Sequence, residues 1–181
     1  MERCWILLGM MGSGKTTVGK LLAERSGREF VDTDQLLKSR FGRPVHRIFA
    51  VYGEDAFRDH ETSVLRQLEP RASVLATGGG TVLREENWTE LRRLGLTIFL
   101  KTDPQKLRER LSQSRKRRPL LEVENWEERL LDLLEFRRSL YERADLVFDV
   151  SNLPLEEAAE RLHAAIDAHE SGGCAAQRGE A

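Results

Sequence analysis

The chain has 181 residues, and its 29 lysines and arginines almost balance its 30 aspartates and glutamates, which leaves a formal net charge of −1. This length predicts one domain of ordinary size, and the balanced charge gives no electrostatic case for nucleic-acid binding, which usually shows as a strongly basic domain. No apolar run approaches the roughly 20 residues of a membrane span, and the apolar run at the start is too short for a secretory signal. The two cysteines form no disulfide framework and no CxxC metal motif. We therefore expect a cytoplasmic protein that binds neither nucleic acid nor a membrane. A monomer is expected as well, although composition does not decide the oligomeric state.

Short apolar runs alternate with longer segments of helical period along the chain. The apolar runs lie at 4–8, 29–31, 74–77, 96–100 and 146–150. The helical segments between and after them lie at 15–25, 34–68, 85–94, 104–112, 126–143 and 155–169, and the segment at 34–68 is broken near Gly42-Arg43-Pro44. Strands that alternate with helices predict βαβ units and a parallel sheet covered by helices on both faces.

Some of these boundaries have a visible local cause. Asp103 stands before Pro104, so that the aspartate can cap a helix whose first residue is proline. Gly27 and Gly95 are typical residues at which helices end. Residues 171–181 are small and polar without an apolar period, and we expect them to form a disordered tail after a single domain at 1–170.

Residues Gly9-Met10-Met11-Gly12-Ser13-Gly14-Lys15-Thr16 match GxxxxGK[ST] at every fixed position, between a strand-like run and an amphipathic segment. Glycines let backbone N–H groups close around phosphate oxygens, and the N-terminus of the following helix faces the anion. Lys15 would place a cation between the β- and γ-phosphates, and the Thr16 hydroxyl would ligate Mg²⁺. The motif predicts a nucleotide site but leaves the reaction open, because ATPases, switches and kinases share it.

Three clusters further along the chain could converge on the γ-phosphate. Asp32 and Asp34 follow a strand-like run, where ligands bind in open α/β sheets. Asp32 could orient Mg²⁺ through water and Asp34 could accept a hydrogen bond from an attacking hydroxyl, although aspartate at a helix start is also a common cap. Arg58 and Glu61 share a helix face, so they form either a surface ion pair or a pair that prepares Arg58 to hold a carboxylate. Gly78-Gly79-Gly80 forms either a plain turn or a backbone that touches a ligand.

Positive charge gathers in residues 108–121, above all in Arg115-Lys116-Arg117-Arg118. Such a run is usually a solvated face. The alternative is a mobile lid that brings an arginine onto the transferring phosphoryl group and excludes water. Further on, Arg137 and Arg138 lie in a predicted helix, where one arginine could point inward.

The order of these motifs, GxxxxGKT, DTD, FRxxE, GGG, RPLL and RxxLY, resembles the shikimate kinase family over about residues 6–150. The resemblance implies a P-loop three-layer αβα fold with a five-stranded parallel sheet, a substrate-binding helical segment at about 32–63 and a lid at about 112–124. It also implies that the γ-phosphoryl group of MgATP passes to the 3-hydroxyl of shikimate, which gives shikimate 3-phosphate and ADP.

The resemblance further implies a role for each matching residue. Shikimate would be bound by Asp34, Arg58, Gly79, Gly80 and Arg137, and the catalytic residues would be Lys15, Asp34 and Arg118. The nucleotide would be bound by Gly12, Ser13, Gly14, Lys15, Thr16, Thr17, Arg110, Arg118 and Asn152, and Mg²⁺ by Thr16 and Asp32. Two choices stay open: Arg117 could take the place of Arg118 in the lid, and Arg138 that of Arg137 in the pocket.

Two other functions use the same motifs. Another P-loop kinase, for gluconate or a nucleotide, would share the scaffold; gluconate also carries a carboxylate, whereas a nucleotide acceptor would need a base-binding pocket that the sequence does not reveal. A P-loop switch or regulatory ATP-binding module would hydrolyse ATP slowly without an acceptor, and it would need neither the paired arginines nor the lid.

Overall fold

The first strand, β1 (Cys4–Leu8), is buried at every residue, as expected for a parallel strand that is covered on both faces. It pairs in parallel with β3 (Ser73–Ala76) on one side and with β4 (Gly95–Lys101) on the other. β2 (Glu29–Asp32) and β5 (Leu146–Asp149) form the edges, so that the strand order is β2-β3-β1-β4-β5 and every pairing is parallel. This computed structural model describes residues 3–114 and 118–176.

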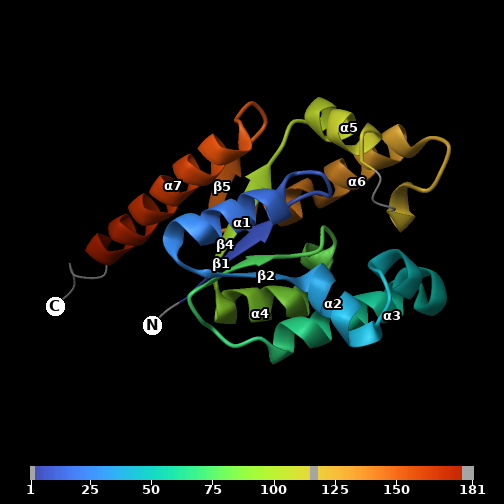
Figure 1. Ribbon diagram of the computed structural model, residues 1–181, viewed down its shortest axis with the longest axis horizontal. Coiled ribbons are helices and arrows are strands. Elements are labelled where there is room, and N and C mark those ends of the chain that lie inside the picture. Colours follow the sequence, from blue (N-terminus) through green and yellow to red (C-terminus); the bar gives the residue numbers. More distant parts are fainter. Residues whose placement is uncertain (1–2, 115–117, 177–181) are drawn as a thin grey trace.

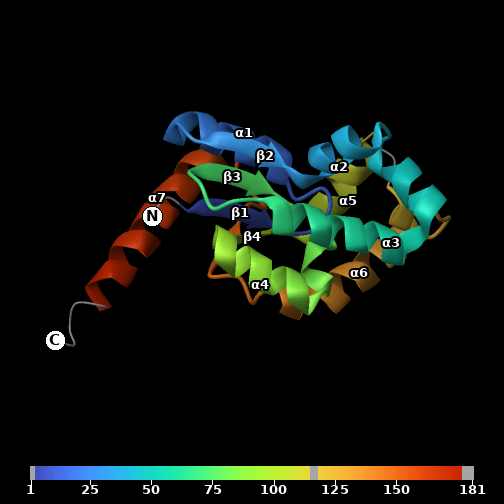
Figure 2. The same cartoon turned by 90° about the horizontal axis from the view of Figure 1, so that it is seen from below.

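Helices cover both faces of the sheet (Figures 1 and 2). α1 (Lys15–Ser26) and α7 (Leu155–Ala176) pack on the face that carries Trp5 and Leu7. α4 (Glu85–Leu94), the end of α3 (Val45–Gln67) and the end of α6 (Trp126–Tyr141) pack on the face that carries Ile6 and Leu8. The alternation along β1 therefore divides the core into two layers, and each fully buried leucine or isoleucine contributes about 1.5–3 kcal/mol.

Two groups of elements extend beyond the carboxyl ends of the strands. α2 (Thr33–Phe41) packs against α3 through a cluster that contains Leu37, Ile48 and Phe57. α5 (Pro104–Ser112) and the 3₁₀ turn η2 (Pro119–Leu121) pack against α6. Figure 1 shows these two groups on opposite sides of the loop between β1 and α1. A second 3₁₀ turn, η1 (Thr81–Leu83), joins β3 to α4.

The predicted elements are confirmed, and most boundaries have the causes expected. The Asp103 side chain accepts hydrogen bonds from the backbone N–H groups of Gln105 and Lys106, at 2.8 and 3.4 Å. The long helical segment divides at Gly42, which ends α2 in the left-handed conformation (φ 61°). A kink within α3 was not predicted: Gly53 has φ 80° and ψ 175°, which is a conformation that glycine adopts without strain.

The last helix is longer than predicted. The apolar period predicts a helix that ends at His169, with a tail from Ser171, but α7 continues to Ala176. No proline interrupts the chain there, and a helix that is already formed gains one hydrogen bond for each residue it adds. The residues after Ala176 in the expected tail lie outside those described.

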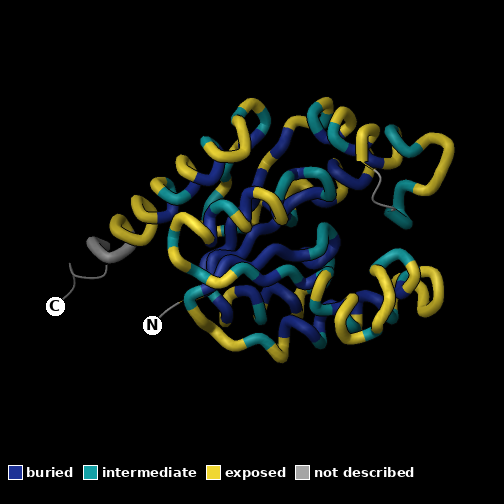
Figure 3. Tube along the Cα trace, in the orientation of Figure 1, coloured by how far each residue is buried: buried dark blue, intermediate teal, exposed yellow. Residues whose placement is uncertain are grey.

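Burial is concentrated in the sheet and in the helix faces that contact it, whereas the outer surface of α7 and much of α2 and α3 are exposed (Figure 3). Within the described ranges, no helix is both long and apolar enough to cross a membrane.

Gly95 at the start of β4 leads to a test of the packing between the central strands. A Cβ atom at this position would overlap the backbone of Cys4 in β1, and a backbone cannot move aside without disturbing the ladder. We expect Gly95→Ala to destabilise the fold by about 1–3 kcal/mol, with a melting temperature lower by roughly 2–4 °C for each kcal/mol. Gly172→Ala is the control, because nothing within the described part of the chain lies within 4 Å of an added Cβ. A melting temperature for Gly95→Ala equal to that of the control would contradict this account.

Candidate functional site

The loop between β1 and α1 is shaped to receive phosphate. Gly12 and Gly14 have φ values of 84° and 96°, in the left-handed region that favours glycine. The Lys15 ammonium is buried and donates hydrogen bonds to the carbonyl oxygens of Gly9 and Met10, at 2.7 and 2.9 Å. The first N–H groups of α1 need acceptors from outside the helix, and a phosphate at the helix N-terminus can supply them.

Thr16 and Asp32 lie together at the edge of this loop. The Thr16 hydroxyl donates to Asp32 Oδ2 at 3.0 Å, while Asp32 Oδ1 accepts from the N–H groups of Asp34 and Gln35 and caps α2. A hydroxyl and a carboxylate oxygen are ligands that suit Mg²⁺, which usually takes its other ligands from phosphate and water. The two residues therefore fit the predicted metal position, and Asp32 also serves as the helix cap that was weighed as the alternative.

A cavity of about 530 Å³ opens over the phosphate loop. Arg110 reaches across it and donates to the Gly12 carbonyl at 3.4 Å. The side chains of Arg110 and Leu155 both lie within 4 Å of the position that a Cβ atom of Gly14 would occupy. Among the predicted nucleotide-binding residues, the lining contains Gly12, Gly14, Lys15, Thr16, Thr17, Arg110 and Arg118.

A second cavity, of about 110 Å³, lies between the α2–α3 group and η2. Its polar lining contains all of the predicted acceptor residues, Asp34, Arg58, Gly79, Gly80 and Arg137, together with Glu61 and Arg118. Its apolar wall is made by Val45, Phe49, Phe57, Pro119 and Leu120. The cavity thus combines a small apolar surface with several cations.

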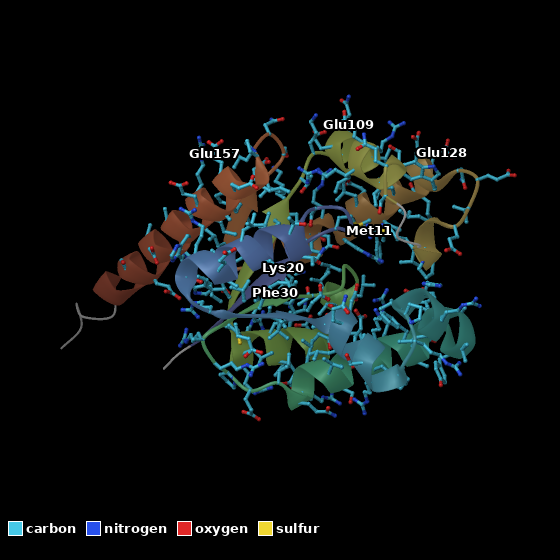
Figure 4. All side chains as sticks on the ribbon, in the orientation of Figure 1. Met11, Lys20, Phe30, Glu109, Glu128 and Glu157 are labelled. Carbon is cyan, nitrogen blue, oxygen red and sulfur yellow. The ribbon has the colours of Figure 1, made fainter. Side chains whose placement is uncertain are left out.

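The two cavities meet. Met11, Asp34, Gly78, Gly79 and Arg118 line both of them, and Figure 4 shows Met11 of the phosphate loop on the inner side of the molecule, facing the α2–α3 group. Glu109 and Glu128, by contrast, point outward from α5 and α6. A group on the phosphate loop and a group in the smaller cavity would therefore face each other across Asp34 and Arg118.

Arg58 is held by two carboxylates from its own helix. It is 6% exposed and pairs with Glu61, which is 2% exposed, and with Glu54 at 3.1 Å. Burial disfavours the charge of Arg58, but the two carboxylates outweigh this effect and raise its pKa. Burial also raises the pKa of Glu61, against the attraction of Arg58. The prediction of an Arg58–Glu61 pair is confirmed, and the pair is buried in the cavity wall and is not a surface ion pair.

The glycine triplet is shaped by this ion pair. A Cβ atom at Gly78 would overlap the Glu61 carboxylate, and one at Gly80 would overlap the Arg58 guanidinium. The loop is also fixed by hydrogen bonds, since the Gly78 N–H donates to the Thr33 hydroxyl at 3.1 Å. The triplet therefore forms a turn that also serves as a packing surface for Arg58 and Glu61.

The choice between Arg137 and Arg138 is settled by their exposure. Arg137 is 2% exposed, lines the smaller cavity and donates to the Gly79 carbonyl at 3.1 Å. Arg138 is exposed and pairs with Glu135 at 2.8 Å. The choice between Arg117 and Arg118 stays open, because only one of them is described. Arg118 lines both cavities, and Arg117 lies outside the described residues.

The cavity carries unused hydrogen-bonding capacity on its cations. Within residues 3–114 and 118–176, the buried Nε atoms of Arg58, Arg118 and Arg137 have no hydrogen-bond partner. Burial lowers the pKa of Arg118, and the negative charge of Asp34 opposes this effect. Buried polar groups are normally paired, and the positive charges of these three arginines around one cavity would suit an anion.

Two predicted nucleotide residues are not in the lining of the larger cavity. Asn152 lines a separate groove with Thr102 and Ser151. Ser13 belongs to the phosphate loop, and its buried hydroxyl has no partner among the described residues. The prediction also missed Glu54 and Tyr141. Glu54 stands one helical turn before Arg58, a spacing that favours pairing, whereas the burial of Tyr141 could not be read from the sequence.

Comparison with known proteins shows the family of this chain. The family model described as shikimate kinase matches residues 11–167. A shikimate kinase of Thermodesulfovibrio yellowstonii is 44% identical over 158 residues, which cover 87% of this chain and 91% of the relative. The solved structure of a shikimate kinase from Acinetobacter baumannii in complex with shikimate is 38% identical, with a TM-score of 0.88 over 93% of this chain and 94% of that one.

A shikimate kinase structure from Bacteroides thetaiotaomicron has 30% identity and a TM-score of 0.83, over 91% of this chain and 98% of that one. Sequence, fold and cavity lining lead to the same result: this chain is a P-loop kinase that belongs to the shikimate kinase family.

Proposed function

We propose that the protein transfers the γ-phosphoryl group of MgATP to the 3-hydroxyl of shikimate and releases shikimate 3-phosphate and ADP. The observation that carries this proposal is the junction of the two cavities at Asp34 and Arg118. A triphosphate on the loop and a small anionic alcohol among the arginines would have their reacting groups on either side of that junction. The reaction needs positioning and charge stabilisation more than a strong base.

The carboxylate of the acceptor would bind between Arg58 and Arg137. Arginine offers parallel N–H groups that match a carboxylate, and both guanidinium groups line the cavity with an unpaired Nε atom, counting the described residues only. With the carboxylate held at that end, the hydroxyls of the ring would face Asp34. Asp34 would accept a hydrogen bond from the attacking hydroxyl and orient it.

In the transfer, a bond forms between the hydroxyl oxygen and the γ-phosphorus, and the bond from that phosphorus to the β-phosphate oxygen breaks. The hydroxyl proton leaves toward Asp34. Lys15 and Arg118 stabilise the charge that spreads over the phosphoryl oxygens. Thr16 and Asp32 would hold Mg²⁺, which neutralises charge on the β- and γ-phosphates when it is bound.

The cavity sizes favour a small acceptor. The acceptor cavity has about a fifth of the volume of the phosphate-loop cavity, 110 against 530 Å³, which favours an acceptor smaller than a nucleotide. Gluconate carries the same carboxylate and stays the alternative acceptor. A switch without an acceptor would have no use for a second cavity that is lined by three arginines. A monomeric state and a cytoplasmic location stay predictions.

The direct test is an assay of ADP release with ATP and Mg²⁺ and with shikimate, gluconate, a nucleoside monophosphate or no acceptor. We expect ADP release to rise with shikimate only, with one ADP formed for each shikimate phosphorylated. ADP release that is the same with and without shikimate would refute the proposal and favour the switch, whereas a rise with gluconate alone would favour the other kinase.

The role of Asp34 predicts a loss of turnover. Asp34→Asn keeps the size of the side chain but removes the charge that orients the hydroxyl, and we expect kcat to fall by about 10²–10⁴-fold with a smaller change in the KM for shikimate. Asp59→Asn is the matched control, because Asp59 is exposed and pairs with Arg84 outside the site. A kcat within twofold of wild type for Asp34→Asn would show that this carboxylate has no part in the reaction.

Arg58 and Arg137 form the proposed carboxylate clamp, and removal of Arg58 should selectively weaken the binding of the acceptor. Arg58→Ala removes a charged hydrogen-bond donor worth about 1.5–3 kcal/mol, so the KM for shikimate should rise roughly 10- to 100-fold with little change in the KM for ATP. The exposed Arg138 provides the control, and Arg138→Ala should keep both values. Equal effects of the two substitutions on shikimate would mean that the carboxylate binds elsewhere.

A further inference from the structure

Tyr141 is the most deeply buried titratable side chain near the acceptor cavity, and the mechanism above does not use it. It is 0% exposed, and its ring stacks on Phe99 of β4 with centroids 5.0 Å apart and an interplanar angle of 15°. Its hydroxyl donates to the Gly79 carbonyl at 2.5 Å. Burial raises the pKa of Tyr141 to about 12, so that the hydroxyl keeps its proton, and its role as a donor, at any ordinary pH.

The same carbonyl also receives Arg137. Arg137 Nη1 donates to Gly79 O at 3.1 Å, and Arg137 and Tyr141 stand one turn apart on the same face of α6. A carbonyl oxygen can accept two hydrogen bonds. Two donors therefore hold Gly79 O. Arg137 belongs to the proposed carboxylate clamp, and Tyr141 does not.

Gly79 occupies a confined position between the two cavities. A Cβ atom there would lie 3.3 Å from the Met11 nitrogen of the phosphate loop, 3.5 Å from the Gly9 oxygen and 3.7 Å from the Tyr141 hydroxyl. The peptide is thus enclosed by the phosphate loop on one side and by Tyr141 on the other. A shift of this peptide would change both the wall of the acceptor cavity and the position of Arg137.

We propose that Tyr141 is a positioning residue for the acceptor: its hydroxyl holds the Gly79 carbonyl so that the Arg137 guanidinium can turn to the carboxylate of the substrate. Tyr141 and Arg137 compete for the same carbonyl. A buried carbonyl is costly to leave without a partner, so without the tyrosine hydroxyl Arg137 would have to remain on Gly79 or leave that carbonyl unpaired. This inference rests on the proposed function, because it assumes an acceptor that carries a carboxylate.

The test is Tyr141→Phe, which keeps the ring on Phe99 and removes only the hydroxyl. We expect the KM for shikimate to rise roughly 5- to 30-fold, the effect of about 1–2 kcal/mol of lost hydrogen bonding, while the KM for ATP stays within twofold. Thr97→Val is the control. It removes a hydroxyl that bonds Asp145 at 2.6 Å near the start of β4, and it should lower the melting temperature without changing the KM for shikimate.

A double-mutant cycle tests whether Tyr141 acts through Arg137. Arg137→Lys keeps the charge but loses the two-pronged contact. In the Arg137→Lys background, Tyr141→Phe should change the KM for shikimate by less than twofold, because the guanidinium that the Tyr141 hydroxyl releases from Gly79 is already absent. Additive effects, or an unchanged KM for shikimate in Tyr141→Phe, would overturn the inference. If the wild-type protein fails to phosphorylate shikimate, the proposed function fails first, which distinguishes the two results.

Discussion

The buried ion pair between Arg58 and Glu61 is the constraint on which the acceptor side of the molecule depends. Two charges taken out of water cost several kcal/mol each, and they are tolerated only when their geometry and further hydrogen bonds compensate. Here the compensation comes from Glu54 and from the Thr81 hydroxyl, which donates to Glu61 at 3.4 Å. An arginine anchored in this way is held in the cavity wall. A buried ion pair is weak evidence for stability, but its geometry fixes the direction of the guanidinium.

The parallel sheet explains why distant residues of the chain meet at this place. β1 ends at the phosphate loop, β2 ends at Asp32 and β3 ends just before the glycine triplet, and all three strands are neighbours in the order β2-β3-β1. Ligands bind at the carboxyl ends of strands in such sheets because the connecting loops gather there. The helical layers add the cations: α3 provides Arg58, α6 provides Arg137, and the lid segment provides Arg118. Each cation thus comes from a different element, and the three meet in the lining of one cavity.

The sequence was sufficient for the elements that repeat a local pattern. The strands, the helix at 85–94 and the Asp103 cap each depend on neighbours within a few residues, so that they could be predicted. The choice between Arg137 and Arg138 could not be predicted from the sequence, because both lie on one helix and only the packing of α6 decides which of them is buried. The apolar period does not predict the kink at Gly53, because a glycine can either stay helical or leave the helix. It does not predict the extension of α7 either, because a formed helix can propagate past its last apolar residue. Tyr141 was assigned no role because its partner, Gly79, is 62 positions away.

The glycines that support the ion pair restrict how the acceptor pocket can be rebuilt. Any side chain at 78 or 80 would occupy the volume of Glu61 or Arg58, so neither position can be diversified while that pair is kept. A protein engineer who wishes to admit a bulkier or uncharged alcohol would have to replace the arginine, its carboxylate partner and a glycine together. Randomising single positions would therefore sample mostly damaged proteins, and the more permissive route to altered selectivity is the apolar wall formed by Val45 and Phe49.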